Sequence, residues 1–247
     1  MVGAPVGSRA VGDPNTPATV PSEPIPAATV VLLRDGVRGL ETLMLRRDAN
    51  LAFAGGAWVF PGGRVDPEDR PADGTGGDTD LAELTAARNA AAREAMEEAG
   101  LTIDAETLVW FAHWTPQQSI ERRFATWFFA ARAPQGAVVI DDGEIRDHEW
   151  VAPDEVLRRH AAGEISLLPP TWMTLRLLGA HARVDDALAR MDADEPSVYQ
   201  TRLGRQEGVL VAMWDGDAGY ESGEVDRPGP RHRLWLGDAG WRLEQSG

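Results

Sequence analysis

Three glutamates in one short run are the residues of this sequence best placed to do chemistry. Glu94, Glu97 and Glu98 are spaced i, i+3 and i+4, so on a helix they share one face, with neighbouring side chains about 5–6 Å apart. Carboxylates this close repel one another, and a divalent cation would relieve that repulsion. Ligation by oxygen alone suits Mg²⁺ or Mn²⁺ rather than Zn²⁺. The alternative is an ordinary solvated face of a Glu-rich helix.

A glycine-containing segment precedes these glutamates. Residues 60–63 read Phe-Pro-Gly-Gly and follow a short apolar run that predicts a strand. Gly62 and Gly63 permit close approach of the backbone and unusual φ values, so a main-chain carbonyl here can face a ligand. A glycine loop that leads to an acidic helix favours a cation site more than the helix does alone.

The elements that must position these groups alternate irregularly between β and α. Residues 64–79 lack periodicity and predict a loop. The first strand, ended by Asp35-Gly36, and the strand that follows it predict a hairpin. Without a regular βαβ rhythm, the order favours an α+β fold, with a mixed sheet sandwiched between helices (αβα) and an extra β-rich C-terminal segment. The predicted helices are 80–99, 153–162, 170–180 and 184–191. The predicted strands are 29–34, 41–47, 57–60, 108–113, 124–131, 145–151, 198–203, 209–214, 233–236 and 241–244.

Composition narrows the function classes. The 247 residues include 39 acidic and 24 basic side chains, for a net charge of −15, and no Cys. Disulfides, thiolate metal sites and a cysteine nucleophile are therefore excluded, and the acidity argues against a general nucleic-acid binder. Residues 1–26 are rich in Pro, Gly, Ala and Ser and predict a disordered tail. We see no signal peptide or membrane span in the sequence, so a cytoplasmic protein is expected.

The helix segment resembles the signature of the Nudix hydrolase family. That signature reads Gly, five residues, Glu, seven residues, then Arg-Glu-hydrophobic-x-Glu-Glu-x-Gly-hydrophobic, and residues 93–101 match its second half in full. Gly63 matches the first half, but five residues later stands Asp69 in place of Glu, with Glu68 beside it. Because 23 residues rather than seven separate Asp69 from Arg93, about 16 residues are inserted within the motif.

A motif split in this way resembles the subgroup that includes the peroxisomal coenzyme A diphosphatase-like Nudix proteins. Residues 43–47 fit the Leu-Leu-x-x-Arg lead-in of that subgroup loosely, but Ala52 stands where the subgroup has a further Arg. The resemblance implies a Nudix fold over residues 27–181 and a C-terminal helix plus β extension, residues 182–247, packed on the same domain. It also makes a homodimer an expectation.

Residue roles follow from the resemblance. Glu94, Glu97 and Glu98, with the carbonyl of Gly62, would bind Mg²⁺ or Mn²⁺, and the bound cation would lower the pKa of a water. Arg93 would pair with Asp69 or Glu68. Glu97, Glu98 or the more distant Glu144 would act as base, although the acidic stretch 141–144 also fits a plain polar turn. The residues expected to be structural are Gly63, Asp69, Arg93 and Gly100. The candidates for substrate contacts are Arg46, Arg47, Arg122, Arg123 and Phe60.

The implied activity is hydrolysis of a diphosphate linkage in a small molecule that contains a nucleoside diphosphate. Coenzyme A or an acyl derivative is the first expectation. ADP-ribose, NADH, a nucleotide sugar and a capped RNA end remain open, with RNA least favoured by the acidity. Two other function classes compete: a catalytically silent nucleotide sensor, and an acidic interaction protein that binds no cation.

Overall fold

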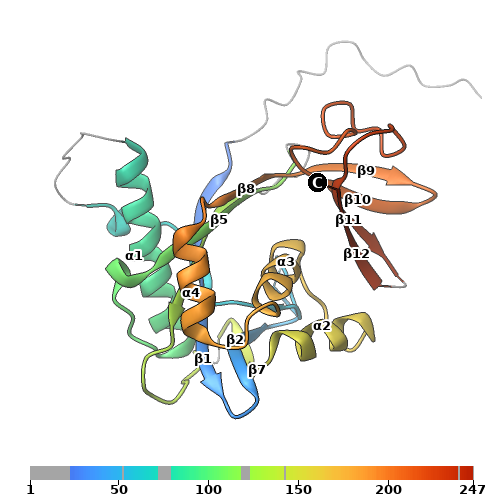
Figure 1. Ribbon diagram of the computed structural model, residues 1–247. Coiled ribbons are helices and arrows are strands. Elements are labelled where there is room, and N and C mark those ends of the chain that lie inside the picture. Colours follow the sequence, from blue (N-terminus) through green and yellow to red (C-terminus); the bar gives the residue numbers. More distant parts are fainter. Residues whose placement is uncertain are drawn as a thin grey trace, which may run out of the picture.

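The chain forms two sheets and four α-helices (Figure 1). A computed structural model describes residues 23–51, 53–71, 79–117, 123–141, 143–238 and 240–246. The larger sheet is mixed and the smaller, near the C-terminus, is antiparallel. This arrangement confirms the predicted α+β class with an extra β-rich C-terminal segment.

The larger sheet is built around the long strand β1. Its order is β3-β2-β1-β6-β5-β8, with β4 paired to β1 and β7 paired to β2. β6 runs parallel to β1. β2 pairs with β1 in the antiparallel sense, which confirms the predicted hairpin. The strands are β1 (Ile25–Gly36), β2 (Gly39–Arg47), β3 (Trp58–Val59), β4 (Gly62–Arg64), β5 (Val109–Thr115), β6 (Phe124–Arg132), β7 (Ile145–Val151) and β8 (Ser197–Gln200).

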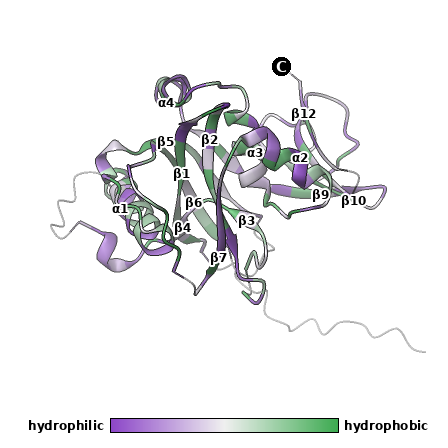
Figure 2. Cartoon of the chain, turned by 90° about the horizontal axis from the view of Figure 1, so that it is seen from below, coloured by the Kyte–Doolittle hydropathy of each residue, from purple (hydrophilic) through white to green (hydrophobic). Residues whose placement is uncertain are grey.

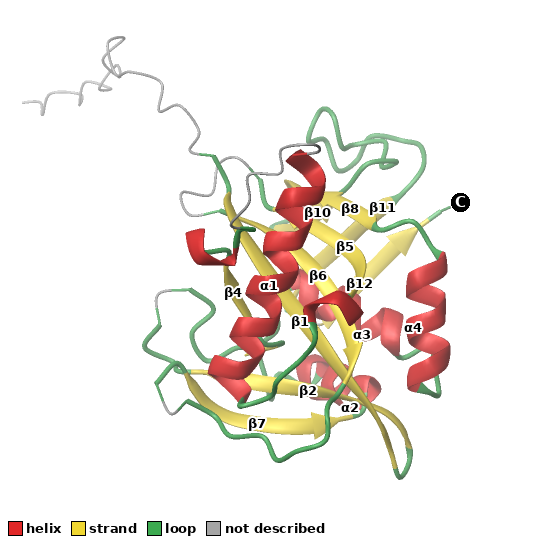
Figure 3. Cartoon of the chain, turned by 90° about the vertical axis from the view of Figure 1, so that its left-hand side faces the viewer, coloured by secondary structure: helices red, strands yellow, loops and turns green. Residues whose placement is uncertain are grey.

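Helices cover both faces of this sheet (Figures 1 and 3). On one face lies α1 (Thr79–Ala99), which packs against Ala28, Val30 and Leu32 of β1. On the other face, Val31 and Leu33 pack with α2 (Pro153–Ala161), α3 (Pro169–Leu178) and α4 (Val184–Ala193). Because side chains alternate along a strand, β1 feeds both core clusters, and this explains its almost continuous apolar sequence.

Alanines set the position of α1. Ala87, Ala91 and Ala95 are completely buried and follow one another at helical spacing on the face that meets the sheet. Small side chains let the helix axis lie close to the strands. Glu94 and Glu98 each follow a buried alanine by seven residues, or about two turns, so they extend the same stripe, whereas Glu97 points away from it. The alanine stripe therefore brings two carboxylates to the sheet.

The smaller sheet has the order β12-β11-β10-β9. Its strands are β9 (Arg202–Gln206), β10 (Val209–Met213), β11 (His232–Gly237) and β12 (Gly240–Gln245). The predicted strand 198–203 is in fact two strands: β8 pairs with β5 in the larger sheet, and β9 begins the smaller one. Trp214 joins the two parts, because its ring contacts both Trp114 and Tyr199 within the larger core cluster.

Two predicted boundaries were wrong. β1 begins at Ile25, within the stretch expected to be a disordered tail, because Ile25 pairs with Phe124 of β6; residues 1–22 lie outside the described part. The expected loop 64–79 begins with the last residue of β4 and holds a short 3₁₀ helix, Pro67–Asp69. Asp66 and Pro67 supply the start of that helix, a signal that local reading of a Gly- and Pro-rich segment overlooks.

Hydrophobic colouring gathers on the central strands and hydrophilic colouring on the outer parts of the helices (Figure 2). Within the described ranges, no helix is both long and apolar enough to cross a membrane.

A buried ion pair holds the loop between β10 and β11, and we predict that it is needed for stability. Arg233 and Asp217 are fully buried and bonded through two nitrogen–oxygen contacts of 2.7 and 2.5 Å. Arg233→Met leaves the Asp217 carboxylate buried without its partner, so the free energy of unfolding should fall by about 3–5 kcal/mol. Urea denaturation measures this. Arg190→Met removes an exposed pair with Asp194 and should cost less than about 1 kcal/mol; equal losses would contradict the prediction.

Candidate active site

Two glycines let the backbone of β4 lie directly against α1. A Cβ atom on Gly62 would come within 2.4 Å of the carbonyl oxygen of Ala28, and one on Gly63 within 2.2 Å of the Glu94 carboxylate. Since real Cβ atoms do not approach that closely, a side chain at Gly62 would push β4 away from the backbone of β1, and one at Gly63 would displace the flexible Glu94 carboxylate. The Phe-Pro-Gly-Gly segment is thus a close-packing requirement as well as a turn.

Arg93 ties the glycine segment, the 3₁₀ helix and α1 together. Its Nε and Nη2 atoms donate to the two oxygens of Asp69 at 3.1 and 2.9 Å, and Nη2 also donates to the carbonyl of Arg64 at 2.9 Å. Nη1 donates to Glu94 at 2.8 Å and to Glu97 at 3.0 Å. Asp69 is buried, and together with Glu94 it raises the pKa of Arg93. The predicted pairing of Arg93 thus falls on Asp69 rather than on Glu68.

Glu98 is the most buried of the three helix glutamates, with an exposed fraction of 6%. Its Oε2 accepts a hydrogen bond of 2.9 Å from the backbone N–H of Gly62. Burial, helped by the nearby Glu94 and Glu144, raises the pKa of Glu98 to about 8 against the opposing effects of the Gly62 N–H and Arg47. In the cation-free protein this group therefore holds a proton at neutral pH.

The other two glutamates of the helix differ in exposure. Burial raises the pKa of Glu94, and Glu97 and Asp66 add to the shift against the opposing effect of Arg93. Glu97 lies at the surface, with 57% of its side chain exposed, and its carboxylate forms an ion pair with Arg93. Solvent exposure therefore increases across the three glutamates, from the buried Glu98 through Glu94 to the solvated Glu97.

The donor set fits a hard divalent cation. Its members are carboxylate oxygens, and burial and neighbouring acids raise the pKa of Glu94 and of Glu98, so a positive ion among them would relieve both the repulsion and the cost of burial. Within the described residues, no three acidic, His or Cys side chains already converge on a single point. Glu94 and Glu97 instead share the Nη1 atom of Arg93, so the glutamates must rotate from their present partners to surround an ion.

Glu144, predicted from an acidic turn, lies beside the helix glutamates in space. It precedes β7, and its backbone carbonyl accepts a hydrogen bond of 2.7 Å from Asp48. Its carboxylate accepts from Arg47 at 2.9 Å, and Arg47 also lies 3.6 Å from Glu98. Glu144 therefore belongs to the same electrostatic cluster as Glu98.

The structure separates the predicted substrate-contacting residues. Arg46 lies on the opposite face of β2 from Arg47 and is paired at 3.6 Å with Asp147. Phe60 was expected to contact substrate but is buried in the hydrophobic core, where a ligand does not reach it. Arg122 falls outside the described residues. Gly100 ends α1 with a φ of +67°, the left-handed conformation expected of that position.

Arg123 lies farther along the sheet. It immediately precedes β6, and its side chain is buried at the edge of an open polar pocket of about 870 Å³. Residues of the C-terminal part, among them Arg202 and Tyr220, complete that pocket.

The backbone carbonyl of Arg64 and the carboxylate of Asp66, 3.7 Å from Arg93, also belong to the candidate active site and were not predicted. Only Asp66 carried a local signal, as an acid just before Pro67.

The buried Glu98 should make the stability of the cation-free protein depend on pH. Between its ordinary pKa of 4.5 and the folded value of about 8, the unfolded chain is ionised while the folded chain holds the proton. The contribution of Glu98 to stability is therefore full below pH 4.5 and falls as the pH rises towards 8, by at most about 1.4 kcal/mol per pH unit. Urea unfolding in EDTA at several pH values measures the slope.

Two variants test the assignment of that slope. Glu98→Gln cannot ionise, so its unfolding free energy should vary less between pH 5 and pH 8. Glu97→Gln alters an exposed carboxylate one residue away and should keep the wild-type slope. A slope that persists in Glu98→Gln would assign the proton to another group.

Comparisons with known proteins agree with this geometry. The family profile described as the NUDIX domain matches residues 23–169, more than half of the chain. A NUDIX hydrolase from Alicyclobacillus acidocaldarius superposes with a TM-score of 0.59 and 23% identity, over 68% of this chain and 96% of that chain. A MutT NUDIX hydrolase from Burkholderia pseudomallei gives a TM-score of 0.46 and 19% identity, over 63% of this chain and 98% of the other. The first superposition shows the fold and the profile shows the family: the chain belongs to the NUDIX domain family.

Proposed function

We propose that this protein hydrolyses the diphosphate linkage of a small molecule containing a nucleoside diphosphate, with the help of Mg²⁺ or Mn²⁺. One observation carries the proposal: the buried Glu98 and the partly buried Glu94 lie against the Gly62-Gly63 backbone, with Glu97 and Glu144 beside them. Burying acids together is costly unless they serve a cation. Glu94, Glu97 and Glu98, with the carbonyl of Gly62, would hold it.

A bound cation would neutralise the diphosphate oxygens and lower the pKa of a coordinated water. The residues of the chain provide the remaining functions. Glu98 must give up its proton before it can act as a ligand. Arg93 keeps Glu94 and Glu97 next to the glycine backbone. Glu144 is exposed, adjacent to Glu98 and outside the helix motif. We therefore propose that Glu144 is the general base that accepts a proton from the attacking water, with Glu97 as the alternative base.

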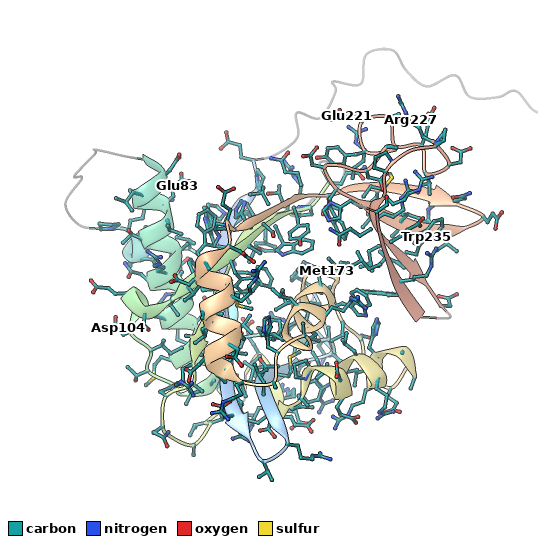
Figure 4. All side chains as sticks on the ribbon, in the orientation of Figure 1. Glu83, Asp104, Met173, Glu221, Arg227 and Trp235 are labelled. Atoms are coloured by element: carbon teal, nitrogen blue, oxygen red, sulfur yellow. The ribbon has the colours of Figure 1, made fainter. Side chains whose placement is uncertain are left out.

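Replacing one proposed ligand should abolish turnover without unfolding the protein. Glu97→Gln removes a charge but keeps the shape of an exposed side chain, so hydrolysis of a diphosphate panel with Mg²⁺ should fall by about 10²-fold or more. Glu83→Gln is the control, because Glu83 is an exposed glutamate near the other end of α1 (Figure 4). Equal turnover by Glu97→Gln and wild type would refute the mechanism.

The same proteins separate the competing function classes. A thermal shift with MgCl₂ that is present in wild type but accompanied by no turnover on any diphosphate would indicate a nucleotide sensor. No response of the unfolding temperature to MgCl₂ would favour the other class, an acidic interaction protein that binds no cation.

For the substrate itself, we propose coenzyme A or an acyl derivative as the first compound to test, on the split motif alone. Cleavage of its diphosphate linkage must yield 4′-phosphopantetheine and 3′,5′-ADP, which mass spectrometry of the products detects. Ala52 stands where the coenzyme A subgroup has an Arg, which argues against coenzyme A as the substrate. If ADP-ribose, NADH or a nucleotide sugar is turned over and coenzyme A is not, the substrate assignment fails while the hydrolase assignment stands.

A further inference from the structure

One arginine occupies the space between carboxylates that come from different parts of the chain. Arg47 ends β2, Glu98 lies near the end of α1, and Glu144 precedes β7. The Nη2 atom of Arg47 is 2.9 Å from Glu144, and its Nη1 atom is 3.6 Å from Glu98. Its guanidinium therefore joins the proposed cation ligand Glu98 to the proposed base Glu144.

A β-bulge creates this arrangement. Along β2, Arg46 pairs with Asp147 of β7, whereas Arg47 pairs with Ile145, so Arg146 is left as an extra residue. Bulges redirect side chains and bend the strand that contains them. Here the bulge brings Glu144 alongside Arg47, and the backbone N–H of Asp48 donates to the Glu144 carbonyl at 2.7 Å.

Arg47 is held firmly, yet its hydrogen-bonding capacity is not fully used. Its backbone N–H donates to Ala57 and its carbonyl accepts from Gly56, so the end of β2 is fixed. Only 16% of its side chain is exposed. Its Nε atom is buried and has no hydrogen-bond partner in the described part of the chain. A guanidinium with a spare donor beside a diphosphate site matches the geometry of phosphate oxygens.

We propose that Arg47 takes the place of the cation in the free protein and moves to the diphosphate when the cation and the substrate bind. In the free state its single positive charge compensates the Glu144 carboxylate and lies beside the Glu98 carboxyl group. A divalent ion that recruits Glu98 has to compete with that contact. Once displaced, the guanidinium presents its donors to the substrate and leaves Glu144 free to accept a proton. Arg47 thus links cation binding to substrate binding, an inference that rests on the proposed function.

The inference predicts opposite effects of one substitution on two ligands. Arg47→Met removes the competitor, so Mn²⁺ alone, measured by isothermal titration calorimetry, should bind about two- to fivefold more tightly than to wild type, as expected for losing a partly exposed ion pair. With Mn²⁺ saturating, a methylene-bridged ADP analogue that resists hydrolysis should bind more weakly to Arg47→Met. A merely structural role would weaken both interactions.

Arg159→Met is the matched control. Arg159 also bridges two carboxylates from different elements, Glu149 of β7 and Glu155 of α2, but lies on the other face of the sheet. It should leave both affinities at wild-type values. Arg47→Gln, which keeps a polar side chain, serves as a second variant with the same expected directions, and thermal unfolding verifies that each variant is folded.

The two proposals fail in different ways. If wild type binds no Mn²⁺, the proposed function falls. If wild type binds Mn²⁺ but Arg47→Met and Arg47→Gln bind it equally well or more weakly, the role of Arg47 is refuted while the hydrolase assignment stands. Unchanged binding of the diphosphate analogue would likewise refute the transfer of Arg47 to the substrate.

Discussion

The contact between Arg93 and Asp69 is the interaction on which the rest of the site depends. Asp69 ends the short 3₁₀ helix after the glycine segment, and Arg93 lies on α1, with 23 residues between them. Two hydrogen bonds from one guanidinium to one buried carboxylate fix both distance and orientation. Because the same guanidinium also reaches Glu94, Glu97 and the Arg64 carbonyl, it sets where the acidic cluster lies relative to the backbone of β4.

That contact also explains how the motif tolerates its insert. Much of the extra segment is helical: α1 begins at Thr79, fourteen residues before Arg93. Ala87, Ala90 and Ala91, in the turns before Arg93, are buried against the sheet, and Asn89 donates to the carbonyl of Asp69 at 2.9 Å. The long segment between Asp69 and Arg93 thus includes helical turns that pack on the sheet, and Arg93 still reaches Asp69.

In the site, the burial of acidic side chains is opposed by nearby positive charge. The alanine stripe and the two glycines press Glu94 and Glu98 against the sheet, which raises their pKa values, while Arg93 and Arg47 supply the compensating positive charge. A divalent cation would add two positive charges to those that the two arginines share with several acids, so a cluster of this kind would gain from binding one. The overall net charge of −15 gave no information about this local balance.

The sequence by itself determined the fold class, the hairpin, the helices and the nine-residue motif, because periodicity and a specific local pattern are encoded by neighbouring residues. Tertiary structure decided which candidates meet. Arg46 and Arg47 are equivalent in a list of basic residues, but side-chain alternation and a β-bulge place only Arg47 beside Glu98 and Glu144. Phe60 is an aromatic next to the glycines in sequence and a core residue in space. These outcomes depend on pairing between strands distant in the chain, and no local pattern contains that information.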